Sequence, residues 1–262
     1  MPHPCASYER SSSCAAPSRR DSCRTTVGGC GTDRAAKARW RRYAAAMTSA
    51  PVPWLSPRTA RRTAAAAVGA LGACWLAAAA VSRLPASPGL ALDAAARSAL
   101  EPLSAVGPID AVAQVLAVVG EQPVSIVVGL AVAVAVLIRF GLQAALAVGV
   151  ASALSAGHVI LMKWVVQRPG PVTAFFEGLG SFPSGHAANA AVLATMGGLL
   201  LRRRWVWSAG AVYVALVALS RVVISAHWFT DTVVGAVAGA GVALLVWSAW
   251  SAARAPRSGA DA

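Results

Sequence analysis

Two histidines, one arginine and one carboxylate stand out in a chain that is otherwise rich in Ala, Val, Leu and Gly. The first group is Pro183-Ser184-Gly185-His186. The second group is Ser220-Arg221, followed after five residues by His227 and after three more by Asp231. Such polar side chains are costly beside lipid unless they have partners or a task. They are therefore the first candidates for a functional site.

The first group has the features of an anion-binding site. It precedes an apolar segment that we expect to be helical, so the backbone N–H groups of the first turn would point outward with the positive end of the helix dipole. Gly185 would let an oxyanion approach the backbone, and the Ser184 hydroxyl would add a donor. Lys163 and Arg221, at the ends of two other apolar segments, would bring fixed positive charge to a low-dielectric edge. Together these residues describe a cradle for a tetrahedral anion.

The second group has the spacing of an oriented nucleophile. His227 and Asp231 are four residues apart and share one face if a helix begins near this point. A carboxylate bonded to one imidazole nitrogen fixes the tautomer and leaves the other nitrogen free to attack. His186, across the cradle, could give a proton to the departing oxygen. Taken alone, each residue would favour a structural network between helix ends; the joint spacing and the common face favour catalysis.

Composition places the chain among membrane proteins. It has 262 residues, of which 57% are hydrophobic and 13% are charged, unlike an ordinary soluble domain. The formal net charge is +13, but residues 1–62 hold 12 of the 23 Lys and Arg side chains. The positive charge therefore belongs mainly to a tail, and nucleic-acid binding is not expected as the primary role. Five cysteines without a C-x-x-C pair indicate neither a zinc site nor a disulfide framework.

Six apolar segments have about the length that a helix needs to cross a membrane. They are expected at Thr63–Ser82, Pro123–Ile138, Gly141–Met162, Ala187–Leu201, Trp205–Leu219 and Thr232–Trp250. A tight turn at Arg139-Phe140 would join the second and third, and a loop over Lys163–Phe182 would lead to the fourth. The predicted fold class is an all-α integral membrane bundle of six transmembrane helices with a disordered basic N-terminal tail. An aromatic belt at the span ends is predicted to include Trp164, Trp205, Trp207, Trp228, Trp247 and Trp250.

The other segments are predicted to lie outside the bundle. Arg83–Gln122 contains many charges and prolines, which favours an external loop with an amphipathic segment around Ile109–Val119 on the membrane surface. Residues 1–62 are predicted to be the disordered tail, residues 63–252 the six-span domain and residues 253–262 a short C-terminal tail. Met47 lies just before the first span, which suggests that translation starts there and that residues 1–46 are not translated.

Basic residues predict the orientation of the bundle, because Lys and Arg in short loops favour the cytoplasm. If the amino terminus lies inside, nine of the Lys and Arg side chains from Arg58 onward are inside and five are outside. We therefore expect both termini in the cytoplasm of a cell whose plasma or inner membrane holds the chain. The motif residues would then gather on the outer face.

The chain from about Ser87 to Trp250 resembles the type-2 phosphatidic acid phosphatases, or lipid phosphate phosphatases, which share a site with the vanadium haloperoxidases. Their signature has three parts, K-x6-R-P, P-S-G-H and S-R-x5-H-x3-D, and the second and third match in full here. The first part departs, because Gly170 stands where the family has Arg, after Arg168-Pro169. One phosphate contact is thus missing or supplied by Arg168, and a lost charge-assisted contact would weaken catalysis.

This resemblance implies a metal-independent hydrolase of lipid phosphates that uses no cofactor. His227 would attack phosphorus to form a phosphohistidine, Asp231 would hold His227, and His186 would protonate the leaving group and later activate water. The phosphate-binding residues would be Lys163, Arg168, Ser184, Gly185 and Arg221. The expected partners are membrane lipids and a lipid phosphate, with polyprenyl diphosphate, phosphatidic acid and phosphatidylglycerol phosphate as candidate substrates. The oligomeric state is left open.

Two alternatives remain at this point. The phosphohistidine could pass its group to an alcohol acceptor, which would make the protein a phosphotransferase. The chain could also be a weakened, non-catalytic relative that binds lipid phosphates, and Gly170 is the best support for that interpretation. A haloperoxidase with bound vanadate is disfavoured by the six apparent spans.

Overall fold

The computed structural model describes residue 37 and residues 52–83, 90–172 and 179–254. The chain divides into two units, Met1–Arg42 and Tyr43–Ala262, and all helices discussed below belong to the second. The N-terminal tail was predicted to be disordered, but its residues up to 51, apart from Lys37, lie outside the described part. Residues 255–262 of the C-terminal tail lie outside it as well. Within the described ranges, all regular secondary structure is helical, which confirms the all-α prediction.

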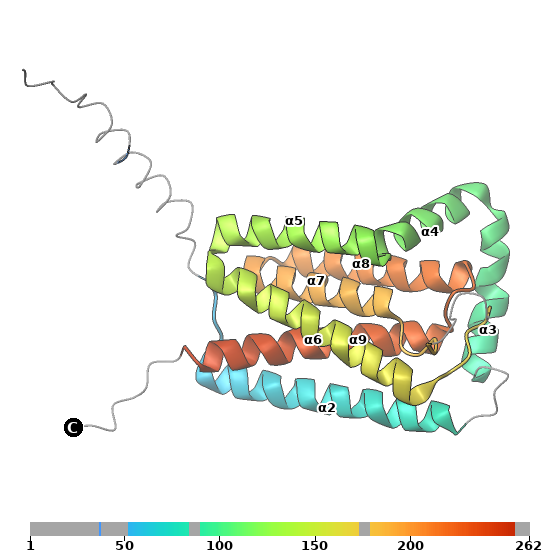
Figure 1. Cartoon of the computed structure of the whole chain (residues 1–262), viewed down its shortest axis with the longest axis horizontal. Coiled ribbons are helices and arrows are strands. Elements are labelled where there is room, and N and C mark those ends of the chain that lie inside the picture. Colours follow the sequence, from blue (N-terminus) through green and yellow to red (C-terminus); the bar gives the residue numbers. More distant parts are fainter. Residues whose placement is uncertain (1–36, 38–51, 84–89, 173–178, 255–262) are drawn as a thin grey trace, which may run out of the picture. The chain divides into compact units, whose positions relative to one another are not determined.

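Six helices run roughly side by side and form the bundle (Figure 1). They are α2 (Pro57–Ser82), α5 (Gln122–Phe140), α6 (Leu142–Val166), α7 (Gly185–Leu201), α8 (Arg204–Val223) and α9 (Phe229–Ala252). Five of them are long and apolar enough to cross a membrane, and α7 is a shorter apolar helix of 17 residues. These helices correspond to the six predicted spans, so the described part of the second unit is an integral membrane bundle.

The first helix begins earlier than predicted. The Ser56 side chain accepts a hydrogen bond from the Thr59 backbone N–H at 3.3 Å, and Pro57 follows it at the start of α2. Serine at the cap and proline in the first turn are favourable helix starts. Residues 57–62, predicted to belong to the tail, are therefore the first turns of the first helix.

Trp247 is also placed differently from the prediction. It is fully buried, and its ring lies 4.8 Å from the ring of Trp54, measured between centroids. Trp247 belongs to the larger apolar cluster, which is formed by α5, α6, α7 and α9, and Trp54 packs against this cluster. Trp247 is thus a core residue and not a member of an interfacial belt.

Two predicted connections are shifted. Arg139 and Phe140 belong to α5, and the turn lies at Gly141, whose φ of 83° favours glycine. Lys163, expected at the start of a loop, lies in the last turn of α6, which ends at Val166. The first difference lengthens α5 at its end by about half a turn, and the second lengthens α6 by about one turn.

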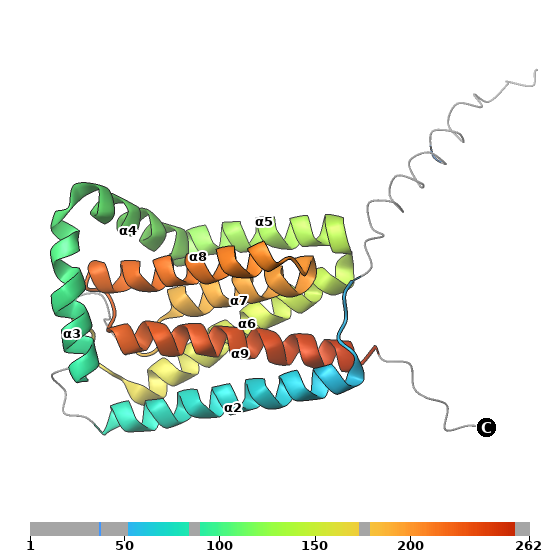
Figure 2. The same ribbon diagram turned by 180° about the vertical axis from the view of Figure 1, so that it is seen from behind.

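The predicted external loop before α5 is mostly helical. It contains α3 (Ala91–Leu100), the 3-10 helix η1 (Glu101–Ala105) and α4 (Gly107–Gly120), and the axes of the two halves meet at 108°. Pro102, which suggested a break, and Pro108 occupy the first turns of η1 and α4, where a missing N–H costs little. In Figures 1 and 2, α3 stands across one end of the bundle and α4 leads back to α5.

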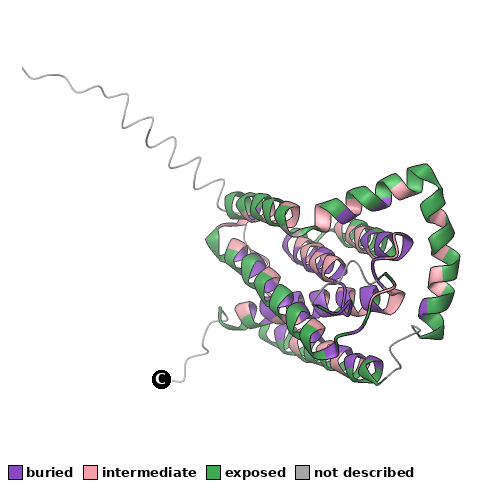
Figure 3. Cartoon of the chain, turned by 45° about the vertical axis from the view of Figure 1, so that its right-hand side comes forward, coloured by how far each residue is buried: buried purple, intermediate pink, exposed green. Residues whose placement is uncertain are grey.

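The helix α9 is the centre of the bundle. In its most apolar stretch 56% of residues are buried, against 6% in α5, which lies at the edge (Figure 3). Two glycines on α9 let α7 approach closely: a Cβ at Gly235 would meet the Ser184 carbonyl oxygen at 2.3 Å, and one at Gly239 would meet the Ala188 carbonyl oxygen at 2.1 Å. Small residues four apart commonly allow such close helix contacts in membranes. The start of α7 is therefore held directly against the start of α9.

Candidate active site

The motif residues gather at the end of the bundle that α3 crosses (Figures 1 and 2). Lys163 lies in the last turn of α6, and Arg221 lies in the last turn of α8. His186 lies in the first turn of α7, and Asp231 lies in the first turn of α9. His227 lies in the short link between α8 and α9. Residues up to 68 positions apart in the sequence thus meet at one end of four helices.

Backbone hydrogen bonds tie the motif segments together. The Ser184 N–H donates to the Asp231 carbonyl oxygen at 2.9 Å, which joins the start of α7 to the start of α9. The Ser181 N–H donates to the Arg168 carbonyl oxygen at 2.7 Å. The Lys163 ammonium donates to the Gly180 carbonyl oxygen at 2.7 Å. The first two bonds use only backbone atoms, whereas the third uses the ammonium group of Lys163, which is also a predicted phosphate-binding residue.

His227 and Asp231 form a buried pair. Their side chains are 4% and 0% exposed, and the His227 Nδ1 lies 3.6 Å from an Asp231 oxygen. The same carboxylate accepts a bond from the Trp228 backbone N–H at 3.2 Å, which fixes its orientation. Burial lowers the pKa of His227, and this outweighs the opposite effect of Asp231. The imidazole therefore favours its neutral form, with Nδ1 toward Asp231 and Nε2 as the other nitrogen.

Two buried polar atoms near this pair have no hydrogen-bond partner among the described residues. They are the Ser184 hydroxyl and the Arg221 Nε. Buried polar groups are nearly always paired, so each such atom calls for an explanation. A Cβ at Gly185 would find its nearest neighbour only at 3.7 Å, so the backbone there is not crowded. A tetrahedral oxyanion held by these donors would supply the missing acceptor.

His186 lies against α4. Its Nε2 is 3.0 Å from the Ala117 carbonyl oxygen, and its ring fills the space that a Cβ at Gly120 would need. The ring is within electrostatic range of Arg221 and His227. Both histidines therefore belong to one site, with α4 holding the first of them.

Arg168 has partners other than the predicted phosphate. One terminal nitrogen donates to Asp231 at 2.5 Å, and the other donates to Asp93 at 2.6 Å. The guanidinium is 7% exposed. The geometry therefore gives Arg168 two carboxylate partners, and its predicted phosphate contact has no support in these contacts.

Asp93 is a site residue that the sequence analysis missed. It comes from α3, is completely buried, and accepts bonds from the Thr230 backbone N–H at 2.7 Å and the Thr230 hydroxyl at 2.9 Å. Together with Arg168 it forms a buried chain of charges that ends at Asp231. The sequence signal that could have identified Asp93 was its position four residues before Arg97, in a segment that was interpreted as an external loop.

No group of three or more His, Cys, Asp and Glu side chains within the described residues is arranged to hold a metal ion. The cations near the pair are instead side chains of the protein, Lys163 and Arg221, whose charges act on His227. Metal independence stays a prediction that an assay has to test.

Comparison with known proteins gave a family match and a similar solved structure. Residues 140–255 match the family model of the PAP2 superfamily. Among solved structures, the chain is similar to a transmembrane PAP2-type phosphatidylglycerolphosphate phosphatase from Bacillus subtilis, with a TM-score of 0.56 and 20% sequence identity over 69% of this chain and 93% of that one. A search of curated proteins found no match. The matched segment, which is less than half of the chain, contains the positions of all three motif parts and the helices α6 to α9, and this segment resembles the PAP2 superfamily.

Proposed function

We propose that this protein is an integral-membrane phosphatase that hydrolyses a lipid phosphate through a phosphohistidine on His227. The observation that carries the proposal is the buried His227–Asp231 pair beside two buried donors, on Ser184 and Arg221, that lack partners among the described residues. An anionic group bound there would meet a neutral imidazole, fixed donors and the charge of Lys163. That combination suits phosphoryl transfer, in which positioning and charge stabilisation do most of the work.

The proposed first step is attack by the His227 Nε2 on the phosphorus atom. The bond between phosphorus and the lipid oxygen breaks, and that oxygen takes a proton from His186. His227 carries positive charge once it is phosphorylated, and the nearby Asp231 carboxylate stabilises that charge. In the second step water gives a proton to His186 and its oxygen attacks phosphorus, which releases inorganic phosphate and restores His227.

The observed position of His186 adds one requirement. Its Nε2 is engaged with the Ala117 carbonyl oxygen of α4, so this nitrogen is available to a leaving group only after α4 or the ring has moved. Hydrogen bonds of catalytic groups in an empty site often rearrange when substrate binds. Binding of a lipid phosphate is therefore expected to displace the end of α4.

The expected substrate is a lipid whose phosphate reaches the rim of the bundle. The site lies at the helix ends, and apolar side chains cover the outer surface of α5 and α6 below it. Phosphatidic acid, phosphatidylglycerol phosphate and polyprenyl diphosphate fit this description. The similar solved structure is a phosphatidylglycerolphosphate phosphatase, which makes that lipid a natural first choice. From the basic residues, the site faces the outside and both termini face the cytoplasm.

The test uses the purified full chain in detergent, a panel of these three lipids and an assay for released inorganic phosphate, with and without EDTA. We expect wild type to release phosphate in both conditions and a His227→Ala variant to release none above background. Radiolabelled substrate quenched in alkali should leave label on wild type and none on the variant. If wild type and the variant are equally inactive on the whole panel, the protein is not this phosphatase.

A non-catalytic lipid-phosphate binder is the second candidate, and two observations favour it over a phosphotransferase. Gly170 replaces the family arginine, and Arg168 is occupied by carboxylates. Such a protein would bind the same lipids but leave them intact. The phosphate-release assay distinguishes the two, and analysis of products with added alcohols would reveal transfer.

A further inference from the structure

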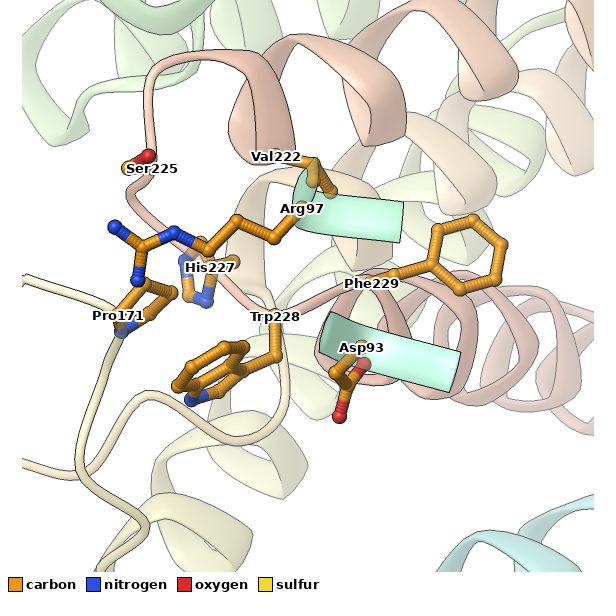
Figure 4. Close-up of a pocket in the computed structure, with 8 residues that line it drawn as sticks. All are labelled: Asp93, Arg97, Pro171, Val222, Ser225, His227, Trp228 and Phe229. Atoms are coloured by element: carbon orange, nitrogen blue, oxygen red, sulfur yellow. The ribbon is translucent and has the colours of Figure 1, made fainter. Parts of the chain in front are cut away.

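A small hollow borders the face of His227 that points toward α3. It is lined by His227, Trp228, Arg97 and Pro171 among others (Figure 4). As it stands, the hollow encloses no space for a water molecule. A phosphate would therefore enter it only after the side chains that line it move apart, but it has the proposed nucleophile in one wall.

Arg97 extends across this hollow. Figure 4 shows its guanidinium beside Pro171 and His227. Its Cζ atom also lies 6.0 Å from the centre of the Trp228 ring. The side chain thus points into the site from α3, although the sequence analysis had placed Arg97 in an external loop.

The position of Arg97 is fixed by its own helix. Asp93 lies four residues earlier, on the same face of α3, and is anchored by bonds to Arg168 and Thr230. This buried anchor sets the rotation of α3 over the site. Arg97 is therefore held above His227 by the same contacts that hold Asp231.

The hollow lies where a family motif is incomplete. Pro171 lines it, and the residue before Pro171 is Gly170, which has no side chain to place there. Arg168, the other arginine of this segment, is committed to Asp93 and Asp231. The loop itself therefore brings no arginine to the hollow, and Arg97 reaches the same space from the opposite wall.

The observed partner of Arg97 would yield to a phosphate. Arg97 pairs with Glu101 at 3.1 Å, but the two side chains are 32% and 48% exposed. Exposed pairs four apart on a helix are weak. A phosphate group carries more charge and accepts two parallel bonds from a guanidinium. A substrate phosphate next to His227 would thus compete well with Glu101.

We propose that Arg97 is a phosphate-binding residue that takes the place of the arginine missing at position 170, and that it contacts a non-reacting oxygen of the phosphate or, in a diphosphate, the distal phosphate group. The inference rests on the proposed function, because it needs a phosphorylated substrate beside His227. It differs from the family pattern in that the cation comes from the helix before the bundle's second span and not from the first motif.

The experiment compares purified full-length variants on whichever lipid phosphate wild type hydrolyses. Arg97→Gln should lower kcat/KM about 10- to 100-fold, Arg97→Lys should lose less, and Gly170→Arg added to Arg97→Gln should recover most of the loss. Glu101→Gln and Arg83→Gln, an exposed arginine at the end of α2, should stay within twofold of wild type. Thermal unfolding in detergent with and without orthovanadate, a phosphate analogue, gives a second readout: the upward shift in Tm should shrink for Arg97→Gln and return in the double variant.

Each contrary result overturns a defined claim. If wild type is active and Arg97→Gln matches it, Arg97 does not bind the phosphate. If Glu101→Gln is as damaging as Arg97→Gln, the arginine acts only through its ion pair. If Gly170→Arg fails to rescue, Arg97 does not stand in for position 170. If Arg97→Gln fails to fold, the Arg97→Lys variant is used to test the contact. A phosphate contact predicts that Arg97→Lys has a raised KM and a smaller increase in Tm with orthovanadate than wild type. If wild type is inactive but orthovanadate still raises its Tm in a way that depends on Arg97, the proposed phosphatase function is refuted and Arg97 remains a phosphate-binding residue.

Discussion

At the scale of single residues, the site is defined by which charges are buried together. Arg168 connects two carboxylates, Asp93 and Asp231, that come from helices far apart in the sequence. Asp231 in turn lies beside His227. Each carboxylate therefore affects the position of the proposed nucleophile, although only Asp231 lies next to it.

Removing the more distant carboxylate should destabilise the protein and impair the site. Asp93→Ala would leave Arg168 with one carboxylate partner, Asp231, beside the Thr230 hydroxyl, and would leave the Thr230 backbone N–H without its acceptor. Breaking a buried pair in this way typically costs about 3–5 kcal/mol, so a clear drop in Tm is expected together with a lower kcat. Asp110→Ala on α4 is the matched control and should change both by little. Equal effects of the two substitutions would show that Asp93 has no special place in the network.

The protonation state of His227 leads to a prediction about how activity and stability depend on pH. Burial lowers the pKa of His227 below the ordinary value of 6.5, so the neutral, nucleophilic form persists as the pH falls past that value. The acid limb of kcat/KM should therefore lie below pH 6.5. Stability follows the same sign: the unfolded chain takes up a proton near pH 6.5 and the folded state resists it, so this residue reduces stability as the pH falls below 6.5.

The measurement is a pH profile of kcat/KM on a monophosphate and on a diphosphate, whose own ionisations differ. A limb of the pH profile that lies at the same pH for both substrates reports an ionisation of the enzyme. An acid limb at or above pH 6.5 with both substrates would mean that burial does not control the protonation of His227 as argued.

At the scale of elements, the contact between α7 and α9 sets the distance between the second and third motifs. It depends on Gly235 and Gly239, where backbone oxygen atoms of α7 occupy the space of a Cβ. Because Ser184 also donates its N–H to Asp231, any separation of these helices would separate the predicted anion cradle from the proposed nucleophile.

Adding a methyl group at this contact should therefore be harmful. Gly235→Ala or Gly239→Ala would push α7 away and cost about 1–3 kcal/mol by overpacking, with a loss of phosphatase activity that is larger for Gly235 because it touches Ser184. Gly149→Ala on α6 has nothing within 4 Å of the added carbon and should be neutral or slightly stabilising. Thermal unfolding and phosphate release on the three variants provide the check. Tolerance of alanine at both α9 positions would argue against the close contact.

At the scale of the whole molecule, the orientation in the membrane decides which leaflet supplies the substrate. Ser104 in η1 is exposed near the site end, and Arg203 is exposed in the link between α7 and α8 at the other end. In a background without the five native cysteines, a membrane-impermeant maleimide should label Ser104→Cys in intact cells and label Arg203→Cys only after lysis. The reverse order would place the site in the cytoplasm and contradict the orientation derived from the basic residues.

The number and type of elements could be predicted from sequence because a membrane leaves few choices. An uncharged apolar segment of about 20 residues must satisfy its own backbone, and a helix does so. Helix ends were less certain, since prolines such as Pro57 and Pro108 fit the first turn of a helix as well as they fit a loop. For the same reason the segment before α5 appeared to be a loop.

The sequence by itself determined the chemistry that this protein can attempt, because the types and spacing of His186, Arg221, His227 and Asp231 are local facts of the chain. Only the tertiary structure decided the partners of the remaining charges. Asp93 and Arg97 lie far from the motifs in sequence, and nothing local distinguishes a buried carboxylate on α3 from a solvated one. Burial and ion pairing are properties of the packed helices, so the assignment of Arg168 to two carboxylates, and of Arg97 to the hollow beside His227, depends on how the bundle closes.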